Sequence, residues 1–402
     1  MAELSEFFKS YVQKESIFTD KSVFLSSYLP ETIHHRDTQI NQIAQILAPI
    51  LRKEKPSNLF IYGKTGTGKT LSIKHVIKEI TAASNETGLQ IRAVYINCKL
   101  KRVADTEYRL LAQLSREFGK ELPSTGLPTD EVYRVFFNAV DQQECPILLV
   151  LDEIDQLIKK TGDSVLYNLL RANDESAKSF MAIVGLSNDM VFIDNLDPRV
   201  RSSLSEEEII FPPYNAFQIQ DILKQRISIA FKEGVLEQGT IEKCSAYSAR
   251  EHGDARRAIE LIRVAAELAE RTGTQKVTLK HIDQAEEKIE RDRISDIVAN
   301  QPKQSQCILY SIVSLSITRK GPMFTGEIYG LYRNLCSKTG LRPLTQRRVS
   351  DVLSELDLFG IINAKIISKG RYGRTREVFL NIPEVSTHSI KETLLKSLDI
   401  RE

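Results

Sequence analysis

The chain has 402 residues, long enough for two or three domains of ordinary size, which excludes a single small module. Hydrophobic residues make up 42% and charged residues 27%, which excludes a largely disordered or collagen-like chain. The net charge of +2 hides an asymmetry: between Arg319 and Arg376 there are twelve Lys or Arg against four Asp or Glu, a balance of +8, so the rest carries −6. A basic segment of this kind favours a polyanionic partner.

Membrane and metal signals are weak. The longest aliphatic run, residues 147–151, is far shorter than the roughly 20 residues that a bilayer span needs. The first ten residues, MAELSEFFKS, carry acidic side chains where a signal peptide carries basic ones. The five cysteines form no C-x-x-C pair, so we expect no zinc site. We therefore expect a cytoplasmic protein with no membrane partner.

In the first half of the chain, apolar runs alternate with amphipathic helical stretches. A helix is predicted over 38–52, and buried strands over 59–62, 91–96, 147–151 and 181–187. Strands that alternate with helices predict a parallel α/β sheet.

The pattern changes at Pro212-Pro213, after which no convincing strand is expected until about residue 361. Helices are predicted over 216–232, 255–271, 281–291, 304–318, 324–338 and 345–358, with linker composition at 299–306. Two strand candidates, 361–367 and 376–381, flank the turn SKGRYGR. Three helices followed by a β-hairpin predict a winged helix-turn-helix.

A phosphate-binding loop follows the strand at 59–62. Its residues are Gly63, Lys64, Thr65, Gly66, Thr67, Gly68, Lys69 and Thr70, which match G-x-x-x-x-G-K-[ST] between a strand and a helix. The glycines let backbone amides surround phosphates, and the helix N-terminus adds partial positive charge. We predict that Lys69 contacts the β- and γ-phosphates and that Thr70 binds Mg²⁺.

Polar residues follow two of the predicted strands, 147–151 and 181–187. Asp152 and Glu153 follow the run ILLVL, at the sheet edge where ligands of α/β proteins bind. We predict that Asp152 holds the Mg²⁺ water shell and that Glu153 orients or deprotonates the attacking water. Asn188, in GLSND, can hold the same water through its amide.

The basic C-terminal module has the features of a DNA-binding surface. In the helix at 345–358 the outward residues of the first turns include Gln346, Arg347 and Ser350, with Arg348 nearer the boundary. The hairpin tip offers Lys369, Gly370, Arg371, Tyr372 and Arg374. A winged helix that binds protein is the alternative, but such domains rarely carry this much positive charge.

Several segments resemble known families. DEID, GLSND, LDPRVRSSL and GDARRAIELI resemble the Walker B, sensor 1, arginine-finger and sensor 2 regions of AAA+ ATPases. PETIHHR at 30–36, LTQRRVSDVLSELDLFG and SKGRYGRTREVFL extend the similarity to archaeal ORC-type DNA replication proteins, relatives of the eukaryotic origin recognition complex and its helicase-loading partner. The resemblance covers nearly the whole chain.

This resemblance implies roles for individual residues. Pro30, His35 and Arg36 would cover the adenine, Asn188 would be sensor 1, and Arg256 would be the sensor 2 arginine that touches the γ-phosphate. Either Arg199 or Arg201 would be the finger that acts on a neighbouring subunit's nucleotide; surface salt bridges are the alternative for all three arginines. A second DNA contact is implied within about 98–130, where Lys99, Lys101 and Arg102 lie.

The resemblance implies an α/β fold: an AAA+ P-loop parallel-sheet domain (1–212), an α-helical lid (213–298) and a winged helix-turn-helix domain (299–402). The implied function is an ATP-dependent initiator that recognises origin double-stranded DNA and helps recruit or load an MCM-type replicative helicase, with slow hydrolysis acting as a switch. Its cofactors would be ATP or ADP and Mg²⁺, other initiator subunits would bind beside it, and it would associate with the chromosome. An ATP-switched transcription regulator and a loader directed by protein contacts remain alternatives.

Overall fold

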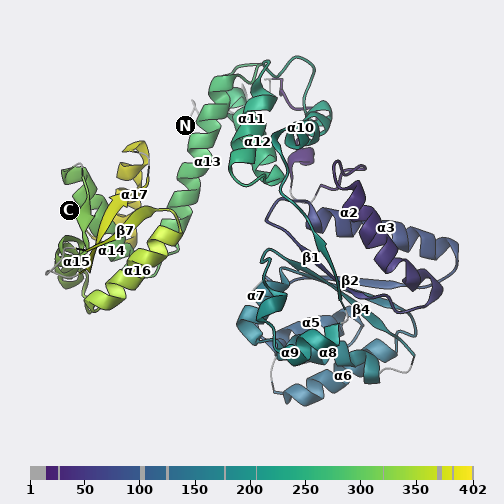
Figure 1. The fold of residues 1–402 in the computed structure, drawn as a ribbon. Helices are drawn as coiled ribbons and strands as arrows, with labels where there is room; N and C mark the ends of the chain where they lie inside the picture. Colours follow the sequence, from purple (N-terminus) through teal and green to yellow (C-terminus); the bar gives the residue numbers. More distant parts are fainter. Residues whose placement is uncertain are drawn as a thin grey trace, which may run out of the picture. The chain divides into compact units, whose positions relative to one another are not determined.

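The computed structural model describes residues 15–25, 28–99, 105–123, 126–175, 178–204, 206–319, 321–368, 374–382 and 384–400. The chain divides into two compact units, Met1–Ile282 and Asp283–Glu402 (Figure 1). Within the described residues, no helix is both long enough and apolar enough to cross a bilayer.

The first unit contains the predicted parallel sheet. Its strands are β1 (Asn58–Tyr62), β2 (Arg92–Asn97), β3 (Ile147–Asp152), β4 (Met181–Ser187) and β5 (Glu206–Ile210). They pair in parallel in the order β2-β3-β4-β1-β5, so the carboxyl ends of β1, β3 and β4 lie next to one another. Strand β1 precedes the phosphate loop, β3 ends at Asp152, and β4 precedes Asn188.

Helices cover both faces of the sheet (Figure 1). On one face lie α2 (Asp37–Leu47), the 3₁₀ helix η2 (Ala48–Arg52) and α3 (Lys69–Glu86). On the other lie α5 (Glu107–Glu117), α6 (Thr129–Asp141), α7 (Ile154–Thr161), α8 (Ser164–Glu175) and α9 (Pro198–Leu204). Successive side chains of a strand point to opposite faces, so Leu148 and Val150 pack with α2 and α3, whereas Leu149 and Leu151 pack with the other layer.

Strand β5 was not predicted. Its sequence, EEEII, begins with three glutamates, a residue type depleted in strands, and only Ile209 is buried. β5 pairs with β1 on one side and forms the edge of the sheet, where charged side chains face solvent at little cost. Because most of β5 is not buried, its sequence lacks the continuous apolar run that makes the fully buried β1, β3 and β4 easy to predict.

The rest of the first unit is helical. It contains η1 (Lys21–Phe24), η3 (Ile193–Asn195), α10 (Ala216–Ala230), α11 (Thr240–Arg250) and α12 (Ala255–Thr272). Asn215 and Gln218 form a capping box at the start of α10, and the Asp254 side chain accepts hydrogen bonds from the Arg256 and Arg257 amides at the start of α12. Helix α13 (Leu279–Ala299) begins in this unit and ends in the second.

The second unit has the winged-helix order. Its elements are α14 (Lys303–Thr318), β6 (Met323–Phe324), α15 (Thr325–Thr339), α16 (Gln346–Leu358), β7 (Ile362–Ser368), β8 (Arg374–Leu380) and α17 (Glu384–Leu398). The strands form an antiparallel sheet in the order β6-β8-β7. The buried face of α16, formed by Val349, Val352, Leu353 and Leu356, packs into the core of this unit.

The α/β fold with a helical region and a winged helix is confirmed, but two expectations for the second half are wrong. Residues 299–306 are not a linker, because α13 continues to Ala299 and α14 starts at Lys303. A strand, β6, does occur before residue 361, at Met323–Phe324. It is identified as a strand by its pairing with β8. A two-residue strand has no periodicity of its own to detect.

Candidate nucleotide site and nucleic-acid interface

The phosphate loop runs from Gly63 to Gly68, between β1 and α3. Gly66 and Gly68 have φ angles of 70° and 93°, a left-handed backbone that suits glycine. A Cβ on Gly66 would lie 1.6 Å from Oδ1 of Asp254, and one on Gly68 would lie 2.8 Å from the Tyr214 hydroxyl. The loop is therefore shaped for glycine by its own backbone and by the close approach of the helical region.

The remaining loop residues differ in exposure. Lys64 and Thr65 are exposed, whereas Thr67 is buried and donates its hydroxyl to the Lys64 carbonyl at 2.8 Å. Gly63 lies against Phe211, whose carbonyl oxygen would be 2.5 Å from a Cβ at this position. The Thr67 hydrogen bond therefore stabilises the loop backbone from inside the loop. The backbone amides of the first turn of α3 follow directly after it.

Lys69 is buried, and its ammonium donates hydrogen bonds to three acceptors within the protein. Its Nζ donates to the Gly63 carbonyl at 2.6 Å, the Lys64 carbonyl at 2.9 Å and Asn188 Oδ1 at 2.8 Å. Burial lowers the pKa of the Lys69 ammonium to about 8, although Asp152 acts in the opposite direction. At pH 7 the side chain is still a cation, positioned to exchange these acceptors for phosphate oxygens.

The acidic end of the site lies beside Thr70. Its hydroxyl donates to Asp152 Oδ2 at 2.9 Å, and the Glu153 amide donates to Asp152 Oδ1 at 2.9 Å. Glu153 has a left-handed φ of 55°, and its Oε2 lies 3.6 Å from the ammonium of Lys99. A strained backbone at a non-glycine residue is typical of functional sites.

The donor set at this end fits Mg²⁺. A hydroxyl and a carboxylate are oxygen ligands of the kind this ion prefers, and Mg²⁺ at nucleotide sites uses one or two carboxylates together with phosphates. Across the part of the chain that the structure describes, no cluster of three or more His, Cys, Asp or Glu side chains could hold a metal by itself. The site therefore suits a cation that arrives with a nucleotide.

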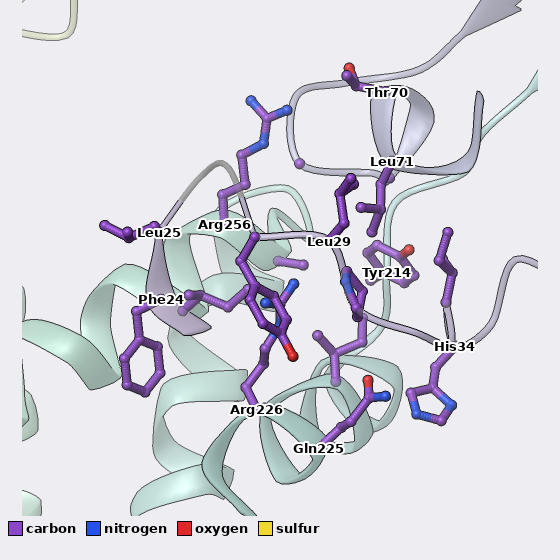
Figure 2. Close-up of a pocket in the computed structure, with 18 of the residues that line it drawn as sticks. Phe24, Leu25, Leu29, His34, Thr70, Leu71, Tyr214, Gln225, Arg226 and Arg256 are labelled. Carbon is purple, nitrogen blue, oxygen red and sulfur yellow. The ribbon is translucent and has the colours of Figure 1, made fainter. Parts of the chain in front are cut away.

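A cavity of about 460 Å³ opens beside the loop (Figure 2). Its walls come from residues 24–25 and 28–34, from the loop and α3, and from α10 and α12. Pro30 and His34, from the N-terminal segment, line the cavity, and so does Arg256 from α12. The cavity thus joins the phosphate loop to a largely apolar wall, a combination that suits a nucleotide.

Helix α10 holds the N-terminal wall in place. The Arg226 guanidinium donates to the Val23 carbonyl at 2.8 Å and lies 4.3 Å from the centre of the Tyr28 ring. Gln225 Nε2 donates to the Thr32 hydroxyl at 2.7 Å. Arg226, Tyr28, Gln225 and Thr32 all line the cavity, so this wall is attached to the helical region.

His35 and Arg36 are not among the described residues that line the cavity. His35 Nε2 lies 3.1 Å from Asp221 Oδ2 on α10, which turns its ring toward that helix. Its neighbour His34 lines the cavity instead. Of the three residues predicted to cover the adenine, Pro30 lines the cavity and His35 and Arg36 do not.

Arg36 acts behind the loop. It is 2% exposed, and its Nε donates to the Thr67 carbonyl at 2.8 Å while NH2 donates to the Pro212 carbonyl at 2.6 Å. The guanidinium also lies 3.8 Å from the centre of the Tyr214 ring. One side chain therefore ties the phosphate loop to the segment that leads into α10.

We expect Arg36→Met to lower the free energy of unfolding by about 2 to 4 kcal/mol, because two buried carbonyls lose their charged donor. Equilibrium urea unfolding measures this loss. Arg92→Met is the control: Arg92 is exposed and also donates to a backbone carbonyl, so its replacement should have little effect. Equal stability losses in the two variants would contradict the proposed importance of the buried contacts.

The three predicted arginines lie in different places. Arg256 is in the first turn of α12 and borders the cavity. Arg201, on α9, lies 3.4 Å from Asp194 in an exposed ion pair, and the Arg199 amide bonds Asp197 Oδ1 at 2.8 Å. Helix α9 supplies none of the described residues that line this cavity, so a finger on α9 would have to act on another nucleotide.

The first turn of α16 is exposed, as predicted. Thr345 caps the helix by accepting the Arg348 amide at 3.4 Å, and Gln346, Arg347 and Arg348 are exposed. Ser350 is partly buried. Arg348 pairs with Asp351 at 3.6 Å, whereas Arg347 carries no such described pair. The helix thus presents an amide and cations of the kind that contact bases and phosphates.

The tip of the hairpin lies outside the described residues. This applies to Lys369, Gly370, Arg371 and Tyr372, and of Arg374 the structure describes only the backbone, at the start of β8. Lys101 and Arg102 also lie outside the described residues. The roles predicted for these side chains therefore stay predictions.

Sequence reasoning missed several residues of the site. Tyr28, Lys74 and Arg226 line the cavity, and the Tyr95 hydroxyl donates to Asp152. Tyr28 lies just before the PETIHHR segment, a position that could have drawn attention to it. Tyr95, Lys74 and Arg226 follow the patterns of ordinary strand and helix residues, and no local signal distinguishes them.

Comparison with known proteins gives consistent matches. Family models for an AAA domain, a Cdc6 AAA+ ATPase-type lid domain and the CDC6 C-terminal winged helix domain match residues 52–188, 220–287 and 296–389. The ORC1-type DNA replication protein of Pyrococcus abyssi is 50% identical over 383 residues, 94% of this chain and 91% of that protein. ORC1-type DNA replication protein 1 of Methanosarcina acetivorans is 50% identical over 389 residues, 96% of this chain and 93% of that protein.

The structure of the Aeropyrum pernix ORC1 protein in complex with DNA matches with a TM-score of 0.85 and 40% identity, covering 95% of this chain and 98% of that one. The phosphate loop on a parallel sheet, the helical lid and the winged helix together define an AAA+ ATPase with a C-terminal winged-helix domain. More narrowly, the chain belongs to the ORC1-type DNA replication protein family.

Proposed function

We propose that this protein is an ATP-dependent replication initiator that recognises origin double-stranded DNA and helps recruit or load the replicative helicase, an MCM-type enzyme. The observation that carries the proposal is the presence, in one chain, of a glycine loop beside a nucleotide-sized cavity and of an exposed basic α16. The DNA complex of the 40% identical Aeropyrum pernix protein supports it. The helicase step rests on the family alone.

The nucleotide is ATP or ADP with Mg²⁺. Pro30 and His34 flank the base, the loop amides and Lys69 bind the phosphates, and Arg256 reaches the γ-phosphate from α12. Thr70 and Asp152 hold Mg²⁺, which neutralises phosphate charge when it is bound. Glu153 accepts a hydrogen bond from the attacking water and Asn188 orients it, so both act on the water and not on the phosphate.

Hydrolysis in this proposal is slow and serves as a switch. Glu153 is paired with Lys99, and Lys69 and Asn188 bond each other, so the side chains that act on water and phosphate are engaged within the protein. The finger, Arg199 or Arg201, is supplied by a neighbouring initiator subunit, which makes hydrolysis depend on assembly. ATP and ADP states then differ in how the lid (213–298) closes on the ATPase domain (1–212).

DNA binding resides in the winged-helix domain (299–402). Gln346, Arg347, Arg348 and Ser350 on α16 approach the major groove, and Lys369 to Arg374 contact the minor groove or its phosphates. The protein therefore associates with the chromosome. Phosphate contacts give affinity for any duplex, and base contacts give the preference for an origin.

An electrophoretic mobility-shift titration tests this function. We expect the protein to bind an origin-derived duplex more tightly than a random duplex at physiological salt, and Arg347→Ala to weaken origin binding about tenfold, since one lost contact to a base or phosphate costs roughly 1 to 3 kcal/mol. ATP affinity should not change in this variant.

Lys396→Ala is the matched control, because it removes one exposed cation from α17 in the same domain. Its DNA affinity should stay within about twofold of the unmodified protein. Equal binding of origin and random duplexes would refute origin recognition. Equal losses in Arg347→Ala and Lys396→Ala would show that only the total charge of the domain matters.

A further inference from the structure

The Asp152 carboxylate accepts a hydrogen bond that the nucleotide-site motifs do not include. The hydroxyl of Tyr95 donates to Oδ2, the same oxygen that accepts the Thr70 hydroxyl at 2.9 Å, while Oδ1 accepts the Glu153 amide. Asp152 is 6% exposed, so its orientation depends on these protein donors. Three donors hold one carboxylate, and each comes from a different segment.

The strand register explains how Tyr95 reaches this carboxylate. Tyr95 on β2 pairs with Val150 on β3, and Asp152 is two residues further along β3. Residues two apart on a strand point to the same face, so the Tyr95 ring extends along the sheet toward Asp152. The Lys74 ammonium lies 4.6 Å from the centre of this ring and holds it from the side of α3.

We propose that Tyr95 is a positioning residue for the metal: its hydroxyl fixes the Asp152 carboxylate in the orientation that holds the Mg²⁺ of the nucleotide. This inference rests on the proposed function. Thr70 is itself expected to be a ligand through a lone pair of its hydroxyl oxygen, and its O–H remains able to donate to Asp152. Tyr95 is not a ligand, and as a neutral donor it orients the carboxylate without placing a second positive charge beside the cation.

If Tyr95 only stabilised the fold, Tyr95→Phe would change the free energy of unfolding and not the metal affinity. In Tyr95→Phe the Asp152 carboxylate keeps two of its three donors, the Thr70 hydroxyl on Oδ2 and the Glu153 amide on Oδ1. Stability should therefore change little in Tyr95→Phe. The change should instead be in metal affinity, since partners of metal ligands typically affect it about 10-fold or more.

The experiment uses the full chain with ADP and Mn²⁺, whose binding is followed by electron paramagnetic resonance. We expect Tyr95→Phe to bind Mn²⁺ about tenfold more weakly in the ADP complex. Binding of a fluorescent ADP analogue in EDTA should stay within about twofold of the unmodified protein, because the bases and phosphates keep all their contacts. Together these results would show that Tyr95 affects the affinity for the metal and not the affinity for the nucleotide.

Tyr133→Phe is the matched control, because the Tyr133 hydroxyl donates to the Glu107 carboxylate, a pair of the same kind in the helices α5 and α6. It should leave Mn²⁺ affinity unchanged. Unchanged Mn²⁺ affinity in Tyr95→Phe would overturn the inference, and so would an equal loss of ADP affinity in EDTA. If the unmodified protein bound no nucleotide, the proposed function would fail first, and this inference with it.

Discussion

Replacing Lys69 by alanine is expected to weaken ATP binding at least about 100-fold, because the variant loses the buried cation that we propose binds the phosphates. The ammonium keeps its charge at pH 7, since its pKa is lowered to about 8 and no further. Its three present acceptors lie around the loop, two of them backbone carbonyls of the loop itself. Titration with a fluorescent ATP analogue measures the loss.

Lys64→Ala provides the control for this change. Lys64 belongs to the same loop and carries the same charge, but its side chain is exposed. ATP affinity should fall by less than about threefold in this variant, as for other exposed charges. Retention of tight ATP binding by Lys69→Ala would refute the assignment of the loop.

We expect Glu153→Gln to retain ATP binding and to hydrolyse ATP at least about 100-fold more slowly, which is the usual contribution of a positioned acid or base. Glutamine has nearly the same shape and leaves the Asp152, Thr70 and Lys69 contacts in place. It lacks the negative charge that accepts a proton from water. Single-turnover hydrolysis, measured beside equilibrium binding, separates the two effects.

The control for this variant is Glu131→Gln on α6, an exposed glutamate paired with Arg134 at 2.6 Å. It removes the same charge from the same domain and should leave hydrolysis unchanged. Undiminished turnover in Glu153→Gln would mean that another group orients the water. A parallel loss of ATP binding would mean that Glu153 supports the loop.

Local sequence determined much of the nucleotide site. Residues 63–70 are contiguous, so their order alone predicts a strand, a glycine turn and a helix N-terminus, and the structure has β1 and α3 at these positions. Asp152 and Asn188 end buried strands whose runs of apolar residues are easy to detect. Parallel strands of one sheet bring such ends together, which is why Lys69 and Asn188, 119 positions apart, are hydrogen-bonded.

The basic charge of residues 319–376 and the spacing of apolar residues in 345–358 likewise predicted the winged-helix domain. The apolar face of α16 is buried as its spacing predicts, and the exposed first turn follows from the same periodicity. The edge strand β5 and the two-residue β6 escaped prediction, because a partner strand and not their own composition makes them strands.

Tertiary packing decided what surrounds the loop. The Arg36 guanidinium donates to the carbonyls of Thr67 and Pro212, the latter 176 positions away, and no local pattern predicts these partners. Likewise, Tyr95 contacts an Asp152 that lies 57 positions further along the chain. Such contacts depend on strand register and on how α10 lies against the N-terminal segment. The sequence alone determined which groups can bind phosphate and DNA, because that chemistry is local; only the folded chain decided which side chains orient them.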